Sequence, residues 1–145
     1  MDFFSEIFSN KVLGISILAC FLAQFIKIFT GKEKFIQLSR IVTSGGMPSS
    51  HSSFVTSLAT LVGIEQGFNS TDFAISSVFA LIIMYDATGV RRAVGKQAAI
   101  LNQILDDIQH KKHIEHKRLK ELIGHTPKEV LFGAILGIIT AIVFA

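Results

Sequence analysis

Two histidines lie beside sequence signals for a helix start, in surroundings that favour chemistry on a phosphate group. His51 stands in the run GGMPSSHSS (residues 45–53), and His125 stands in the run GHTPKE (residues 124–129). A helix N-terminus presents free N–H groups and the positive end of the helix dipole, and both suit a phosphate. A neutral imidazole nitrogen can attack phosphorus at neutral pH. The two runs therefore predict phosphoryl transfer at a site that holds both histidines.

Cationic side chains accompany the histidines along the chain. Lys27 and Arg40 lie near and after the end of the first apolar stretch, and Arg91 and Arg92 follow the third. Such cations neutralise the equatorial phosphate oxygens as charge spreads in the transition state. Asp86 lies about one helical turn before the arginine pair, so we expect it to orient a cation of the site rather than act as a base. The alternative for Arg91 and Arg92 is that they only anchor the chain to anionic lipid headgroups.

Four apolar stretches must position these side chains. Half of the 145 residues are hydrophobic and only 17% are charged, which is below the roughly 25% of soluble domains. A membrane-spanning helix needs about 20 residues, with a lower limit near 17. The first and last stretches are apolar all round, whereas helices of a soluble bundle keep a polar face. We therefore expect an all-α polytopic membrane protein, one membrane domain with about four transmembrane helices, and a soluble bundle is the alternative. The expected spans are residues 11–29, 48–68, 73–90 and 129–145.

The distribution of positive charge predicts the topology. Twelve of the fourteen Lys and Arg residues lie in the two segments that follow the first and third stretches. Four spans place these segments on the same side, and positively charged loops stay in the cytoplasm. We expect a multi-pass protein of the cell membrane whose site faces the cytoplasm, with no signal peptide removed. The basic balance is then explained by topology, and no nucleic-acid partner is needed.

Residues 91–124 form an amphipathic insert in this scheme. Apolar side chains recur at helical spacing between charges, which predicts helices lying on the inner leaflet. His110, His113 and His116 fall every third residue, so the first and last lie about 120° apart on a helix. A solvated basic face explains them better than a metal site. The lone Cys20 lies in an apolar run and provides neither a disulfide nor a cysteine zinc site.

Three runs of the chain resemble a known enzyme family. GGMPSSHSS is similar to the second motif of the type 2 phosphatidic acid phosphatases, and GHTPKEVLFGAILG (124–137) is similar to their third motif. With YDATGVRR (85–92), the combination resembles the divergent branch of that superfamily, which also includes the vanadium haloperoxidases. The resemblance covers about residues 20–140. The sequence departs from the family pattern at the first-motif spacing, and at Ile41, Ser50, Leu119 and Glu129, where the family has Pro, Gly, Arg and Asp.

The resemblance implies a role for each matching residue. His125 would be the nucleophile that forms a phosphohistidine, Glu129 its carboxylate partner, and His51 the acid that protonates the leaving alkoxide. It implies no metal and no cofactor. Phosphate-binding roles would fall to Ser49 and Ser50, to Lys27 or Arg40, and to Arg91 or Arg92.

Plainer interpretations stay open. Thr126, Pro127 and Glu129 are also a good helix start, in which Glu129 serves only as a capping-box acid. Ser49 or Ser50 could likewise be only a helix cap. We expect hydrolysis of a phospholipid or isoprenoid phosphate, and the alternative is a catalytically silent lipid-phosphate binder or scaffold. Because four helices are few to enclose a site, a homodimer is plausible.

Overall fold

The computed structural model describes residues 2–30, 46–112 and 124–145, and within these ranges it contains six helices and no strand. This architecture confirms the predicted all-α fold. Arg40, Ile41, His113, His116 and Leu119 lie outside the described residues. The helices are α1 (Phe3–Ser9), α2 (Lys11–Lys27), α3 (Ser50–Gln66), α4 (Thr71–Thr88), α5 (Val90–Lys112) and α6 (Pro127–Phe144).

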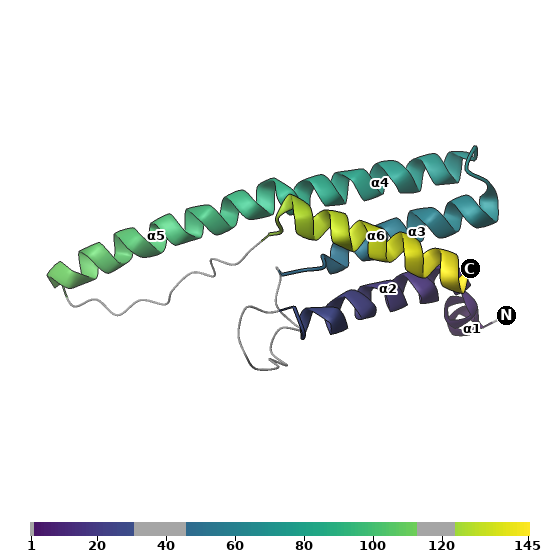
Figure 1. Ribbon diagram of the computed structural model, residues 1–145, viewed down its shortest axis with the longest axis horizontal. Helices are drawn as coiled ribbons and strands as arrows, with labels where there is room; N and C mark the ends of the chain where they lie inside the picture. The colour runs from purple at the N-terminus through teal and green to yellow at the C-terminus, as the bar shows by residue number, and fades with distance from the viewer. Residues whose placement is uncertain (1, 31–45, 113–123) are drawn as a thin grey trace.

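Helix α3 lies at the centre of the bundle and packs against α2, α4 and α6. Helices α2, α3, α4 and α6 run in alternating directions, and the two chain termini lie at the same end of the bundle (Figure 1). The other end therefore gathers the C-termini of α2 and α4 with the N-termini of α3 and α6. These are the segments that carry the predicted site residues.

The helices α2, α3, α4 and α6 fall on the four predicted apolar stretches, but four spans are not confirmed. Within the described residues, α6 and the continuous helix Thr71–Asp106 are long and apolar enough to cross a membrane. A third span results if α1 and α2, which meet at 58°, act together. Helix α3 has 17 residues and many Ser and Thr side chains. Its neighbours cover those side chains, so a polar central helix fits inside an apolar shell.

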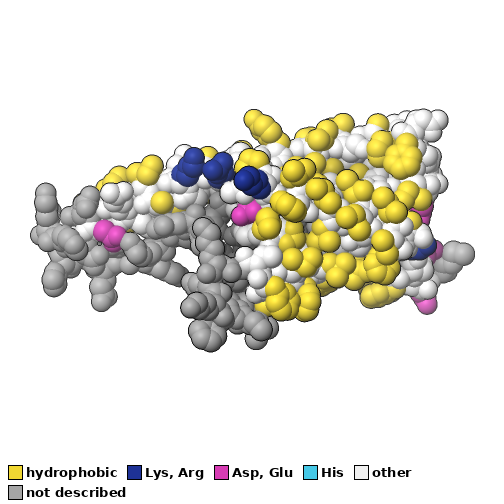
Figure 2. All heavy atoms as spheres, viewed as in Figure 1, with side chains coloured by type: hydrophobic (Ala, Val, Ile, Leu, Met, Phe, Trp, Pro, Cys, Tyr) yellow, Lys and Arg dark blue, Asp and Glu magenta, His cyan; other side chains and the backbone are white. Residues whose placement is uncertain are grey.

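The outer surface of the bundle is apolar, as a lipid-facing surface is. Large hydrophobic side chains of α4 and α6 are exposed, among them Leu81, Ile82, Leu131 and Ile142. Figure 2 shows them as a nearly continuous hydrophobic face, which gives way to a row of basic side chains at the start of α5. A soluble bundle would bury such side chains. The chain therefore has the surface of a membrane protein.

Small residues bring α6 against α3. A Cβ atom added at Gly133 would collide with the backbone of Ser49, and one at Gly137 would collide with the carbonyl oxygen of Ser53. The hydroxyl of Thr56 donates to the carbonyl oxygen of Ala134 at 3.1 Å. Close backbone approach with hydroxyl hydrogen bonds is the usual way in which helices associate in membranes.

Helix α5 continues the direction of α4 beyond the bundle (Figure 1). The combined helix Thr71–Asp106 has 36 residues, which gives a length of about 54 Å against a hydrocarbon core of about 30 Å. Part of it must therefore lie outside the hydrocarbon. The expected amphipathic helix is present, and its position on the inner leaflet stays a prediction.

Candidate functional site

The segment before α6 is fixed by backbone contacts with the end of α4. Gly124 has φ +98°, and a Cβ atom there would collide with the backbone of Arg91 and Arg92. The next residue, His125, donates its backbone N–H to the carbonyl oxygen of Ala87 at 2.9 Å. Only glycine allows this left-handed conformation and this close approach together. The result is a buried His125, 3% exposed, held against the C-terminus of α4.

Glu129 has two roles at once. Its Oε2 accepts the backbone N–H of Thr126 at 3.0 Å, and Glu129 N–H in turn donates to the Thr126 hydroxyl at 3.4 Å. This is the predicted capping box, and Pro127 occupies the first turn as predicted. The same Oε2 lies 3.3 Å from His125 Nδ1. The capping and histidine-partner interpretations of Glu129 are therefore compatible, since one carboxylate makes both contacts.

The surroundings of His125 favour its neutral form. Burial lowers the pKa of the imidazole below its ordinary value, and the nearby positive charge of Lys27 lowers it further. The Glu129 carboxylate and the backbone of Gly46 act in the opposite direction, because both accept hydrogen bonds from a protonated ring. The causes that lower the pKa of His125 outweigh those that raise it. A neutral ring at neutral pH keeps a nitrogen lone pair that can act as a nucleophile.

His51 lies on the first turn of α3 and faces His125. The centroids of the two rings are 6.1 Å apart, with an angle of 62° between the ring planes. His51 also interacts electrostatically with Lys27, Arg91 and Asp86. Residues from four helices therefore surround one small volume at this end of the bundle.

Lys27 is a buried cation beside the start of α3. Its side chain is 3% exposed, and Nζ lies 3.5 Å from the Ser50 hydroxyl oxygen. Within the described ranges, no carboxylate lies within 4.0 Å of this ammonium group. A buried charge without a close counter-ion is costly. The position is thus favourable for an anion.

The two arginines differ in their placement. Arg91 Nε donates to Asp86 Oδ2 at 2.7 Å, in an ion pair that is partly exposed. Asp86 therefore contacts a cation, as its predicted orienting role requires. Arg92 is exposed and meets the His125 segment through its backbone, at Gly124.

Ser49 caps α3 and joins it to α6. The Ser49 hydroxyl accepts the backbone N–H of Ser52 at 3.3 Å, and Ser49 N–H donates to the carbonyl oxygen of Glu129 at 2.9 Å. The structure thus brings together every predicted site residue that it describes, with Arg92 at the edge. Sequence reasoning gave no role to Gly124 or Ala87. The sequence signal for the role of Gly124 was a glycine directly before the histidine. No sequence signal indicated the contact between Ala87 and His125.

The part of the chain that the structure describes offers no cluster of three or more His, Cys, Asp or Glu residues that could hold a metal ion. Among these described residues, the groups that could bind a ligand are the two imidazoles, the Lys27 ammonium group, Arg91 and the N-terminus of α3. This set suits an anion with several oxygens, as a phosphate is.

Comparison with known proteins agrees with the three motif runs. A model of the Divergent PAP2 family matches residues 8–140. The chain is 41% identical to the uncharacterized membrane protein YuiD of Bacillus subtilis (strain 168), and the alignment covers 97% of both chains. No solved structure matches. Since the family match spans nearly the whole chain, this protein belongs to the Divergent PAP2 family.

Proposed function

We propose that this protein is a membrane-embedded, metal-independent lipid phosphate phosphatase that acts through a phosphohistidine. The observation that carries the proposal is the arrangement of His125, which is buried, contacts Glu129 and lies beside His51 and the buried Lys27. Membership of a PAP2-related family and the apolar exterior support a membrane lipid as the substrate.

In the first step, His125 attacks the phosphorus of the substrate. With the Glu129 carboxylate accepting a hydrogen bond from Nδ1–H of His125, the lone pair of Nε2 is available for attack. An N–P bond forms while the bond between phosphorus and the lipid oxygen breaks. Protonated His51 gives its proton to the leaving alkoxide, and the lipid alcohol departs. The distance of 6.1 Å between the ring centroids of His51 and His125 supports a role for both histidines on one phosphoryl group.

In the second step, water hydrolyses the phosphohistidine. His51, now neutral, accepts a proton from the attacking water, an O–P bond forms, and the N–P bond breaks. Inorganic phosphate leaves and His125 regains its lone pair. Both steps develop negative charge on the phosphoryl oxygens, and in this proposal Lys27, Arg91 and the α3 N-terminus stabilise that charge.

The proposed substrate is a phospholipid phosphate or an isoprenoid phosphate at the cytoplasmic face of the cell membrane. The concentration of Lys and Arg in the sequence segments that follow the first and third apolar stretches supports that orientation. Labelling of a cysteine introduced at Lys112 from outside intact cells would contradict it.

A catalytically silent lipid-phosphate binder is the second candidate. It is favoured by the fact that Glu129 and Ser49 both have complete structural roles as helix caps. In that case the buried cation and the helix N-terminus would still hold the phosphate, but no N–P bond would form.

The test is phosphate release by purified protein in detergent, with EDTA present, on phosphatidate, phosphatidylglycerophosphate and polyprenyl mono- and diphosphates. We expect release that vanadate blocks, and loss of at least about a thousandfold in kcat for His125→Gln. His110→Gln, at a histidine of α5 to which the proposal gives no role, is the matched control and should retain activity. Binding of these lipids without release by the unmodified protein would establish the silent binder instead.

A further inference from the structure

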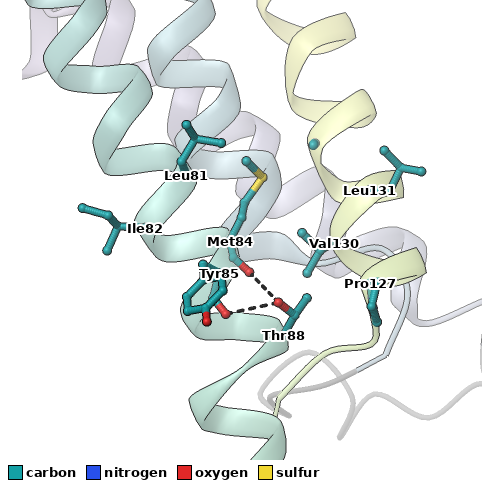
Figure 3. A pocket seen from close by; sticks show the side chains of 9 residues that line it. Leu81, Ile82, Met84, Tyr85, Thr88, Pro127, Val130 and Leu131 are labelled. Carbon is teal, nitrogen blue, oxygen red and sulfur yellow. Dashed lines mark hydrogen bonds between the residues drawn. The ribbon is translucent and has the colours of Figure 1, made fainter.

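An open apolar groove lies between α4 and α6, next to the candidate site. Its volume is about 710 Å³, within the range of small-molecule sites. Figure 3 shows Leu81 and Met84 of α4 on one side and Val130 of α6 on the other, with Thr88 and Pro127 at one end. The lining residues are Leu81, Ile82, Met84, Tyr85, Thr88, Pro127, Val130, Leu131 and Ala134.

One end of the groove adjoins the residue that we propose as the nucleophile. Thr88 follows Ala87, whose carbonyl oxygen accepts the backbone N–H of His125. Pro127 stands two residues after His125 and begins α6. The wall of the groove is therefore continuous with the segment that positions the imidazole.

The rest of the groove leads away from the charged end along the lipid-facing surface. From Thr88 to Leu81, and equally from Pro127 to Ala134, the helices rise by about 10 Å. Leu81 is 63% exposed and Leu131 is 59% exposed, so the groove opens to the outside of the bundle. The Thr88 hydroxyl donates to carbonyl oxygens of its own helix, those of Met84 and Tyr85. The residues that line the groove therefore offer few free hydrogen-bonding groups to a polar ligand.

We propose that this groove holds the hydrocarbon chain of a lipid phosphate whose phosphate group lies at His125. The inference rests on the proposed function and adds where the chain of the substrate binds. The positive charges of Lys27 and Arg91 favour an anionic group at one end of the ligand. The apolar groove favours a hydrocarbon chain attached to that anionic group. A linear alkyl or isoprenoid chain satisfies both, and it can enter sideways from the bilayer. A second copy of this chain fits less well, because about 10 Å of groove matches only two turns of a docked helix.

The test uses a linear alkyl phosphate with a photoactivatable diazirine in its chain, added to the purified full-length protein in detergent. After irradiation, mass spectrometry locates the adducts. We expect adducts on the lining residues of the groove, competed by unlabelled alkyl phosphate. The corresponding alcohol, which lacks the phosphate, should label the groove about tenfold less. Equal labelling by the alcohol, or adducts spread over Phe21, Phe25 and Ile75 on other exposed faces, would overturn the proposal.

Two variants sharpen the result. Ala134→Phe fills the groove and should lower labelling by about tenfold, whereas Ala74→Phe places the same side chain on an exposed part of α4 outside the groove and should not. Unchanged labelling in folded Ala134→Phe contradicts the proposal. The mapping on the unmodified chain does not depend on the folding of either variant.

Labelling also separates this inference from the proposed function. Adducts in the groove without any phosphate release would support the binding site and contradict the enzyme. Phosphate release with adducts outside the groove would support the enzyme and contradict the binding site.

Discussion

The backbone N–H of Ser49 donates to the carbonyl oxygen of Glu129, with 2.9 Å between nitrogen and oxygen. The bond joins the residue that caps α3 to the first turn of α6. The Glu129 carboxylate contacts His125, and Ser49 is followed by Ser50 and His51. The hydrogen bond between Ser49 and Glu129 therefore aligns the two segments that carry the histidines. The geometry of the site therefore depends on how closely α3 and α6 pack.

Exchange of Glu129 separates its two roles. Glu129→Gln keeps an oxygen that can accept the Thr126 N–H, so stability should change by less than about 0.5 kcal/mol. The charge that supports His125 is lost, and we expect kcat to fall about 10- to 100-fold. Glu129→Ala should also lose the helix cap, which lowers the free energy of unfolding by about 1 kcal/mol more. Thermal unfolding and phosphate release measure the two effects. Full activity of folded Glu129→Gln would leave Glu129 with a capping role alone.

Replacement of Lys27 should weaken anion binding without harming the fold. Lys27→Met removes a buried cation that has no close carboxylate in the described part of the chain, so stability should be unchanged or higher. Stabilisation of the protein by vanadate should disappear, because stabilisation by a ligand follows its affinity. Lys11→Met, at the opposite end of α2, is the matched control and should keep the vanadate effect. Thermal unfolding with and without vanadate decides the matter, and an intact vanadate effect in Lys27→Met would contradict the anion site.

Two glycines should respond to alanine in opposite ways. Gly133→Ala forces a Cβ atom against the backbone of Ser49, so we expect a loss of about 1–3 kcal/mol. Gly14 lies within α2 with open space around it, and Gly14→Ala should stabilise by about 0.5–1 kcal/mol. Unfolding in detergent compares the pair. Equal stability of both variants would mean that α3 and α6 do not pack as closely as described.

Stability and activity should both fall as the solution becomes acidic. Burial lowers the pKa of His125 in the folded protein, so the unfolded chain binds more protons between that lowered pKa and the unfolded value of about 6.5. The His125 contribution to stability is therefore complete above about pH 6.5 and is lost as pH falls toward the lowered pKa. Turnover should fall over the same acid range, because the protonated ring has no lone pair for attack. Unfolding temperatures against pH should show a flatter acid slope for His125→Asn, and an unchanged slope would refute this assignment.

Much of this structure could be read from local patterns in the sequence. The apolar stretches located α2, α3, α4 and α6, and the Thr126 to Glu129 run located the start of α6 together with its capping box. Alternating helix directions were enough to predict that the polar runs share one end. These features depend on residues a few positions apart, so hydrophobic length and capping chemistry determine them.

Only tertiary packing decided the rest. That Lys27 is buried against Ser50, that Gly124 lies against the backbone of Arg91, and that the His51 and His125 rings face each other all depend on how four helices fit together. The same holds for the central position of α3 and for the groove between α4 and α6. Close packing is set by the shapes of whole surfaces at once, here by Gly133 against Ser49, and no spacing along one segment encodes the distance to another.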